Sequence, residues 1–484
     1  MKNLLSCVLL FFLLAACGSP TTAASTQAVV PTQSLPTLPL LDSPTEAVAP
    51  KAQPTAGNTY SVAPGGNDNG PGSLAQPWQT LQHAVDSVAP GDTILVQSGA
   101  YLGARIANSG TPQAWIALRA AAGASVLLNA PGPENWHGSI LEIENGDEAV
   151  AYWIIDGLEV SGAPSWGIDS RGTEDYKNHH ITIRGNRVHD NGLGTGRTGI
   201  FAAFTDDVLI EGNISYGNGE HGIYVNNSSD RFTIRGNTVY ANANCGIHLN
   251  GDESMGGDGV MTNGVVENNI IYENGTGGGS AINMDGVSSS LVQNNLIYNN
   301  HATGIALFYE NGAECSQNNR ILHNTILMPA NGRWAVLVAD PACVNNQVFN
   351  NILYSYHSYR GSISFGDGIP AGFQSDYNVV VNAFTTNDGD TVLDLSGWQA
   401  LGFDQHSFTA TPETLFVNPA GHDYHLREGS PAIDAASSQG VTRDLEGNLR
   451  PAGDAPDMGA FEWGSSPPVG SIFNYLLFLL RRSG

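Results

Sequence analysis

A short phrase recurs seven times between Arg184 and Tyr354, as in IRGNRV, VENNII and ILHNTI, each time with an asparagine two residues before an apolar position. The asparagines are Asn186, Asn213, Asn237, Asn269, Asn295, Asn324 and Asn351, so the steps are 27, 24, 32, 26, 29 and 27 residues. A period of about 20 to 50 residues is typical of a solenoid. Each unit holds short apolar runs of period 2 separated by Gly and Asn, which indicates strands and turns. The sequence therefore predicts an all-β fold, a parallel β-helix with one coil per repeat.

A second recurring phrase, seen in TGIF, HGIY and CGIH, supplies another strand of each coil. Its alternation predicts inward-facing side chains at Ile168, Ile200, Ile223, Ile247, Ile282 and Ile305, and two residues later at Val225, Leu249, Met284 and Leu307. We expect the repeated asparagines to stack at an inner corner, because amide ladders satisfy each other's donors and acceptors. A second ladder is expected at Asn191, Asn218, Asn242, Asn274 and Asn300.

Both ends of the chain carry distinct segments. Lys2, an apolar run and Leu14-Ala15-Ala16-Cys17 resemble the signal peptide and lipobox of bacterial lipoproteins, which implies cleavage after residues 1–16 and lipidation of Cys17. An ordinary signal peptide with an incidental cysteine is the alternative. Residues 17–57 read as a disordered Pro/Thr/Ser tether. Residues 464–484 form a linker and an apolar tail whose nine-residue run reaches about 14 Å, too short to span a bilayer.

These segments predict a bacterial cell-envelope lipoprotein that faces the periplasm or the exterior and touches the membrane through its N-terminal lipid only. The chain has 19 Lys and Arg against 45 Asp and Glu, a net charge of -26, which argues against nucleic acid as a partner. We expect a monomer.

The cysteines of the repeat region sort by position. Cys315 and Cys343 lie nine and eight residues before a ladder asparagine, so we expect them about 5 Å apart in consecutive coils and joined as a disulfide. Cys245 is expected to stay reduced.

Residues 60–103 contain PGGNDNGPG, an amphipathic helix expected over 78–88, and PGDTI before Gly99-x-Tyr101. This block resembles the amino-terminal segment of bacterial pectate-lyase-like right-handed β-helix proteins. Residues 153–357 are similar to right-handed β-helix repeats, and residues 415–463 resemble the type Q choice-of-anchor module through DYHL at 423–426, SPAID at 430–434 and DMGAFE at 457–462.

The resemblance implies a right-handed parallel β-helix with three parts: an N-terminal cap over 58–103, coils over 104–385 and a capping or choice-of-anchor-like module over 386–463. It is specific for fold only, because β-helices carry lyases, hydrolases, epimerases and adhesins alike.

The chain departs from the enzymes of that fold. Lys177 is the only lysine after Lys51, so the base lysine of the lysine-dependent pectate lyases has no counterpart on a central coil, and the Asp-Pro-His signature of the mannuronan epimerases is absent. Hydrolases of this fold gather several aspartates on neighbouring coils. This chain has acidic residues in its coils but lacks the motifs of that family; the residues are Asp206, Asp207, Asp252, Glu253, Asp258, Asp285 and Glu310.

The outward positions of the second phrase form a ribbon across the coils, because neighbouring strands lie about 4.8 Å apart. Aromatic faces beside amides suit sugar rings, so we predict an exposed substrate-binding ribbon that includes Phe201, Asn226, Asn250 and Asn283. The alternative is that these side chains pack under loops at 252–262 and 309–316.

The sharpest catalytic hypothesis makes Tyr224 and His248 an acid/base pair that removes the proton beside a uronate carboxyl. Asp285 would orient His248 or hold a calcium ion that neutralises the carboxylate. The loop at 251–259 offers candidate calcium ligands at Asp252, Glu253 and Asp258, although a flexible acidic loop is the alternative reading.

Two functions fit the sequence. The first is a cell-surface or periplasmic lipoprotein that binds a polysaccharide and cleaves or modifies it along the ribbon, as a polyuronate lyase or epimerase or as a hydrolase, with a lyase favoured. The second is a non-catalytic surface adhesin or a rigid structural β-helix.

Overall fold

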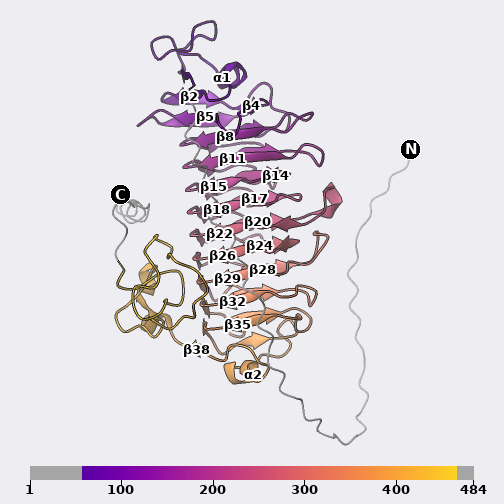
Figure 1. The fold of residues 1–484 in the computed structure, drawn as a ribbon, viewed down its shortest axis with the longest axis vertical. Helices are drawn as coiled ribbons and strands as arrows, with labels where there is room; N and C mark the ends of the chain where they lie inside the picture. The colour runs from indigo at the N-terminus through magenta and orange to yellow at the C-terminus, as the bar shows by residue number, and fades with distance from the viewer. Residues whose placement is uncertain (1–56, 466–484) are drawn as a thin grey trace, which may run out of the picture. The chain divides into compact units, whose positions relative to one another are not determined.

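The computed structural model describes residues 57–465. From Thr59 to Thr409 the chain forms a stack of coils whose strands make three parallel sheets (Figure 1). Sheet A contains β1 (Thr59–Val62), β2 (Thr93–Val96), β5 (Ile116–Ala120), β8 (Ala151–Asp156), β11 (Asn178–Arg184), β15 (Leu209–Glu211), β18 (Thr233–Arg235), β22 (Val265–Glu267), β26 (Leu291–Gln293), β29 (Arg320–Leu322), β32 (Gln347–Phe349) and β35 (Gln374–Asp376), with β14 (Thr205–Asp206) paired to β11.

Sheet B contains β4 (Ala104–Ile106), β7 (Leu141–Ile143), β10 (Ile168–Arg171), β13 (Ile200–Ala203), β17 (Ile223–Asn226), β20 (Ile247–Asn250), β24 (Ser280–Asp285), β28 (Thr303–Phe308), β31 (Val336–Val338), β34 (Ile363–Phe365) and β37 (Phe384–Thr385). Sheet C contains β3 (Gly99–Leu102), β6 (Val126–Ala130), β9 (Glu159–Ser161), β12 (Arg187–His189), β16 (Ile214–Tyr216), β19 (Thr238–Tyr240), β23 (Ile270–Tyr272), β27 (Leu296–Tyr298), β30 (Thr325–Met328), β33 (Ile352–Ser355), β36 (Val379–Val380) and β38 (Phe408–Thr409).

The core lies between these sheets and follows the alternation of the repeats. The inward positions predicted for sheet B are all fully buried: Ile168, Ile200, Ile223, Ile247, Ile282, Ile305, Val225, Leu249, Met284 and Leu307. The prediction of an all-β parallel β-helix is confirmed.

Both asparagine ladders are present. Asn186 donates its backbone N–H and its side-chain Nδ2 to Oδ1 of Asn213, each at 3.0 Å, and Nδ2 also donates to the carbonyl of Ile155 at 3.1 Å. The same side-chain contact continues coil by coil to Asn378, and the second ladder runs from Asn191 to Asn300.

The residue before each ladder asparagine has a positive φ. This conformation favours Gly or Asn, which explains why the phrase reads GN or NN in most coils. The positions are Gly185, Gly212, Gly236, Asn268, Asn294, His323, Asn350 and Tyr377.

The N-terminal end is covered by helix α1 (Leu81–Ser87), which falls within the range expected for it. Thr80 caps the helix by accepting from the backbone of His83, and Leu81, Ala84 and Val85 are buried. The coils begin earlier than predicted, because β1 and β2 already pair in sheet A, so the boundary at 104 is too late.

The other end extends past the predicted limit of 385. Strand β38 continues sheet C, and helix α2 (Leu395–Gln399) places Trp398, fully buried, against Phe365 and Phe384 at ring-centroid distances of 5.1 and 4.9 Å.

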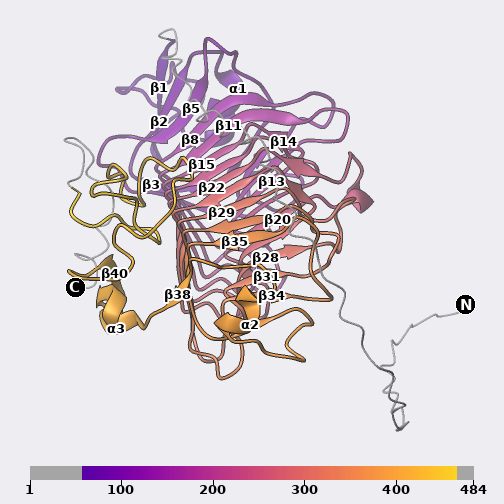
Figure 2. The same ribbon diagram turned by 60° about the horizontal axis from the view of Figure 1, so that its bottom comes forward.

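A small module after β38 packs on the outer side of sheet C (Figure 2). It contains α3 (Pro412–Leu415), β39 (Phe416–Asn418), η2 (Pro419–Gly421) and β40 (Asp423–Leu426), with β39 and β40 antiparallel. Its apolar residues share a second core with sheet C: Leu415, Phe416, Tyr424 and Phe461 pack with Tyr298, Leu327 and Ile352. Whether this is a choice-of-anchor module stays a prediction.

The signal peptide, the lipidation site Cys17, the tether and the C-terminal apolar tail lie outside the described residues. Within residues 57–465, no helix is both long and apolar enough to cross a membrane.

Candidate functional site

The predicted ribbon register is confirmed by the strand pairing of sheet B. Phe201, Tyr224, His248 and Asn283 lie opposite one another in β13, β17, β20 and β24, and two residues further on the same holds for Asn226, Asn250 and Asp285. These seven side chains therefore form two columns on the outer face of four consecutive coils.

The prediction that the ribbon is exposed is wrong for its substrate-binding members. Phe201, Asn226, Asn250 and Asn283 are at most 8% exposed, whereas Tyr224 and His248 are partly exposed. Phe201 packs against the rings of Trp166 and Tyr224, with centroids 5.1 and 5.5 Å apart, and Asn250 donates to the Tyr224 hydroxyl, so the ribbon side chains cover one another.

Asp285 holds one of these loops. Its carboxylate accepts the backbone N–H groups of Glu310 and Asn311 at 3.0 and 2.8 Å, and that of Gly312 at 3.3 Å. The carbonyl of Asn311 in turn accepts from Glu253 at 2.9 Å, which ties this loop to the loop containing η1 (Glu253–Met255). Asp285 is thus a loop anchor with both carboxylate oxygens in use.

The hydrogen-bond partner of His248 is His221, so the orienting role predicted for Asp285 is wrong. His248 Nδ1 and His221 Nε2 are 3.0 Å apart, and the backbone N–H of Cys245 donates to His221 Nδ1 at 3.1 Å. Burial lowers the pKa of His248 to about 4 and that of His221 well below its usual range. Both rings are therefore neutral near pH 7.

Tyr224 lies against His248, with ring centroids 4.5 Å apart and planes 8° from parallel. Its hydroxyl accepts from Asn250 Nδ2 at 3.2 Å, and burial raises its pKa. The side-chain carbonyl oxygens of Asn226, Asn227 and Asn250 are buried without a hydrogen-bond partner. An unsatisfied buried polar atom costs about 1–3 kcal/mol, so these three oxygens are an energetically costly part of the site.

The first column continues toward the N-terminal end through Asp169, which the alignment of the recurring phrase already places in the outward row, and through Glu142, which the sequence analysis missed. Glu142 and Asp169 lie in register with Phe201, and Asp169 pairs with Arg171 at 3.0 Å. Burial raises the pKa of nearby Glu144, whose carboxylate lies 2.8 Å from His137. The first of these coils lacks the recurring phrase, and only the alternation in LEIE marks its strand.

A cationic and aromatic stack borders this part of the column. The guanidinium of Arg171 lies 4.6 Å from the Trp166 ring and 4.8 Å from the Phe201 ring, and that of Arg197 lies 5.0 Å from Trp166.

Glu220 is a further carboxylate beside the histidine pair. It lies 3.6 Å from His221 Nε2, and burial raises the pKa of the Glu220 carboxyl.

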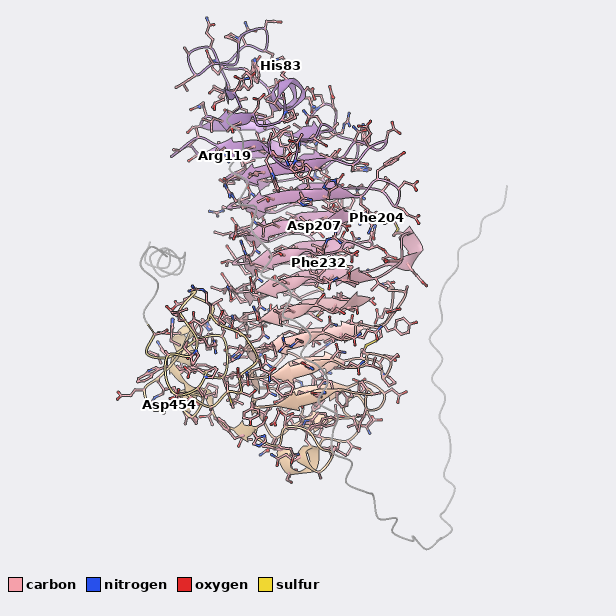
Figure 3. The ribbon with its side chains drawn as sticks, in the orientation of Figure 1. His83, Arg119, Phe204, Asp207, Phe232 and Asp454 are labelled. Carbon is pink, nitrogen blue, oxygen red and sulfur yellow. A yellow bond between two sulfur atoms is a disulfide. The ribbon has the colours of Figure 1, made fainter. Side chains whose placement is uncertain are left out.

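The acidic residues at the turn after sheet B are already neutralised. Arg231 contacts Asp207 at 2.9 Å and Asp206 at 3.1 Å, and Lys177 lies 3.6 Å from Asp206. Figure 3 labels Asp207 and Phe204 at this turn. Lys177 is the only lysine in the coils, and it is paired with a carboxylate. It is therefore not a candidate for the catalytic base of a lysine-dependent lyase.

One group of possible metal ligands occurs among residues 57–465: His221, Cys245 and His248, whose ligating atoms lie within 4.8 Å of one another. The group does not fit a metal ion. Cys245 donates its N–H to His221 Nδ1, so the neutral ring carries its proton on Nε2, the atom that would have to bind. Burial also raises the pKa of the Cys245 thiol to about 12, whereas metals bind the thiolate.

The predicted calcium ligands are not gathered. Asp252 Oδ1 accepts from Ser254 Oγ at 2.6 Å and Asp258 Oδ1 from the backbone of Val260 at 3.1 Å, while Glu253 is exposed. A calcium site in this loop stays a prediction.

The two remaining cysteines of the coils are joined. Cys315 and Cys343 form a disulfide with Cα atoms 4.8 Å apart, and Cys245 is free and buried.

Comparison with known proteins supports this fold. The family model "Pel9A-like, right handed beta helix region" matches residues 60–206, and "Right handed beta helix region" matches residues 250–384. The chain therefore carries pectate-lyase-like right-handed β-helix repeats.

Among individual proteins, the chain is similar to pectate lyase PEL9 of Emericella nidulans, with 32% identity over 139 residues that cover 26% of this chain and 33% of the fungal protein. The crystal structure of pectate lyase Pel9A superposes with a TM-score of 0.55 at 17% identity, covering 85% of this chain and 98% of that one. The complex of XylC with xylose superposes with a TM-score of 0.53 at 11% identity, covering 84% and 99%. The match thus spans about a third of the fungal relative's length, and the structural likeness concerns the fold.

Proposed function

We propose that this chain acts on a polysaccharide, and that the sugar contacts the columns of sheet B around Tyr224 and His248. The observation that carries the proposal is the pairing of a partly exposed, neutral histidine with a stacked tyrosine on adjacent coils, beside amide oxygens that lack partners. The local similarity to a pectate lyase supports a uronate-containing polymer as the substrate.

The reaction that suits these groups is β-elimination. The deprotonated Tyr224 oxygen would take the proton from the carbon beside the uronate carboxyl. The electron pair of that C–H bond would form the new C=C bond, and the glycosidic oxygen would leave and take the proton back from Tyr224. Burial raises the pKa of Tyr224, so activity should increase toward alkaline pH. Epimerisation, in which a second acid delivers a proton to the opposite face of the same carbon and the glycosidic bond stays intact, is the related outcome.

The second candidate is a non-catalytic glycan-binding or rigid envelope protein. The burial of Phe201, Asn226, Asn250 and Asn283 favours it, because buried side chains contact a long polymer only if the residues around them move.

The test is release of unsaturated ends from pectate, alginate and glycosaminoglycans by the purified chain, followed as the absorbance of the new conjugated double bond. Y224F should abolish release, while the exposed Y309F should leave it unchanged. If no uronate polymer yields unsaturated ends but one binds, the protein is a binder. If none binds, the proposed site is wrong.

For location, we propose that lipidation of Cys17 anchors a monomeric protein to the cell envelope. The C17S variant should then be released from membranes, and a second variant that lacks residues 472–484 should remain bound.

A further inference from the structure

We propose that His221 is a positioning residue that keeps the ring proton of His248 on Nε2, so that the site presents an N–H donor to an acceptor oxygen of the substrate. The inference rests on the proposed function and replaces the acid/base role that the sequence analysis predicted for His248 with the role of a hydrogen-bond donor.

The backbone N–H of Cys245 determines which nitrogen of His221 is unprotonated. This group is only a donor, and it donates to His221 Nδ1 at 3.1 Å. Its position is fixed by the strand ladder, because the carbonyl of Cys245 accepts from Gly222 at 3.1 Å and the thiol sulfur accepts from the N–H of Ser280 at 3.4 Å. His221 Nδ1 must therefore be the unprotonated nitrogen of the ring.

The proton position on His248 then follows from the chemistry of a neutral imidazole, which carries one N–H. With Nδ1 as acceptor, His221 carries its proton on Nε2 and donates it to His248 Nδ1 at 3.0 Å. His248 Nδ1 is then the acceptor, and the single proton of this ring is on Nε2. The order of donors is thus Cys245, then His221, then His248.

The opposite arrangement is excluded by proton count. If His248 Nε2 offered a lone pair, Nδ1 would carry the proton and donate to His221. His221 would then accept at both nitrogens and would be an anion, in a site that buries it to 5% exposure. His248 therefore does not act as a general base through Nε2.

The groups that face the histidine pair agree with a neutral state. Glu220 lies 3.6 Å from His221 Nε2; burial raises the pKa of its carboxyl, and the charge of Arg197 opposes this shift. Tyr224 covers the His248 ring with its face and leaves the ring edge for hydrogen bonding. Among the described residues, His248 Nε2 has no hydrogen-bond partner.

The ligand group must then be an acceptor. A uronate carboxylate fits, because a neutral N–H donor beside Tyr224 would hold the carboxylate next to the carbon that loses its proton. Such a hydrogen bond to a charged group contributes about 1.5–3 kcal/mol, which corresponds to about a 10- to 150-fold effect on binding or rate.

The experiment is a long-range ¹H–¹⁵N correlation spectrum of the ¹⁵N-histidine-labelled full chain, with assignment of His248 by its loss in H248Q. In the wild type, Nε2 of His248 should show the shift of a protonated nitrogen and Nδ1 that of an unprotonated one. H221Q should preserve this pattern, since its amide oxygen accepts and its amide nitrogen donates. H221A should give a mixture of tautomers.

Addition of an oligouronate should shift the Nε2–H signal of the wild type and of H221Q, and should shift it less in H221A. A wild-type His248 with its proton on Nδ1, or an H221A variant with an unchanged tautomer, would overturn the proposal. The tautomer is measured without substrate, so a confirmed tautomer with no response to any oligouronate counts against the proposed function, and the positioning role of His221 would stand.

Discussion

Removal of one rung of the asparagine ladder, as in N269A, should destabilise the β-helix by about 4 kcal/mol. Asn269 Oδ1 accepts from the backbone and side chain of Asn237 at 2.9 and 3.0 Å, and Asn269 Nδ2 donates to Ile234 and Asn295 at 2.9 and 3.0 Å. The side chain is fully buried, so water does not replace these four bonds. At about 1 kcal/mol for each bond the sum is about 4 kcal/mol. That is a large part of a typical stability of about 5–15 kcal/mol.

The measurement is the urea midpoint of the full chain by circular dichroism, with T276A as control because Thr276 is an exposed turn residue of the same coil. T276A should stay within about 0.5 kcal/mol of the wild type. A loss below about 1 kcal/mol for N269A, with an unchanged denaturant slope, would refute the reasoning, because it would mean that the ladder amides are satisfied in other ways after the truncation.

Three further predictions concern stability. The double variant C315A/C343A should lose about 3.5 kcal/mol in urea unfolding, since the disulfide closes a loop with a sequence separation of 28; no loss would show that the bond does not form in solution. Burial lowers the pKa of His248 from 6.5 to about 4, so the unfolded chain binds more protons between these values and stability falls as pH falls through this window. Between pH 6.5 and 5 the wild type should lose about 1.5 kcal/mol more than H248Q, and parallel pH curves would contradict this. Burial alone would lower the pKa of His425, but its hydrogen bonds to Glu446 and Asp423 outweigh burial and raise the pKa to about 9. The stabilisation of the folded state by protonated His425 should therefore be full below pH 6.5 and should disappear as pH rises through about 9. In H425Q the melting temperature should fall less between these pH values than in the wild type.

The repeat explains why so much of the fold was predictable. The ladder asparagines, the inward isoleucines and the column register all follow from aligning equivalent positions in successive coils, because parallel strands stack in register. The same alignment brings His221 beside Cys245, since both precede the glycine of the recurring phrase. That contact was therefore available from the sequence, although it was not recognised.

The burial of the column residues could not be predicted from the repeat alignment. The loops after sheet B, including the one that Asp285 anchors, differ in length and sequence from coil to coil, so no periodic signal marks where they lie. Their contacts join residues on different coils through backbone groups, as in the three amides that Asp285 accepts. Side-chain type alone predicted a ligand-binding carboxylate there, and the structure shows that backbone amides already occupy it.

The covered ends of the coil stack have a consequence for how copies of the protein meet. An uncovered edge strand of a parallel sheet accepts another strand, and a stack of identical coils would then grow by addition of further copies. Here the first strand β1 forms a bridge from Val62 to Trp78, and the last strand of sheet B forms a bridge from Phe384 to Leu393. Local chain segments thus pair with main-chain groups of the first strand of sheet A and of the last strand of sheet B, which leaves fewer main-chain groups open to a strand from another copy.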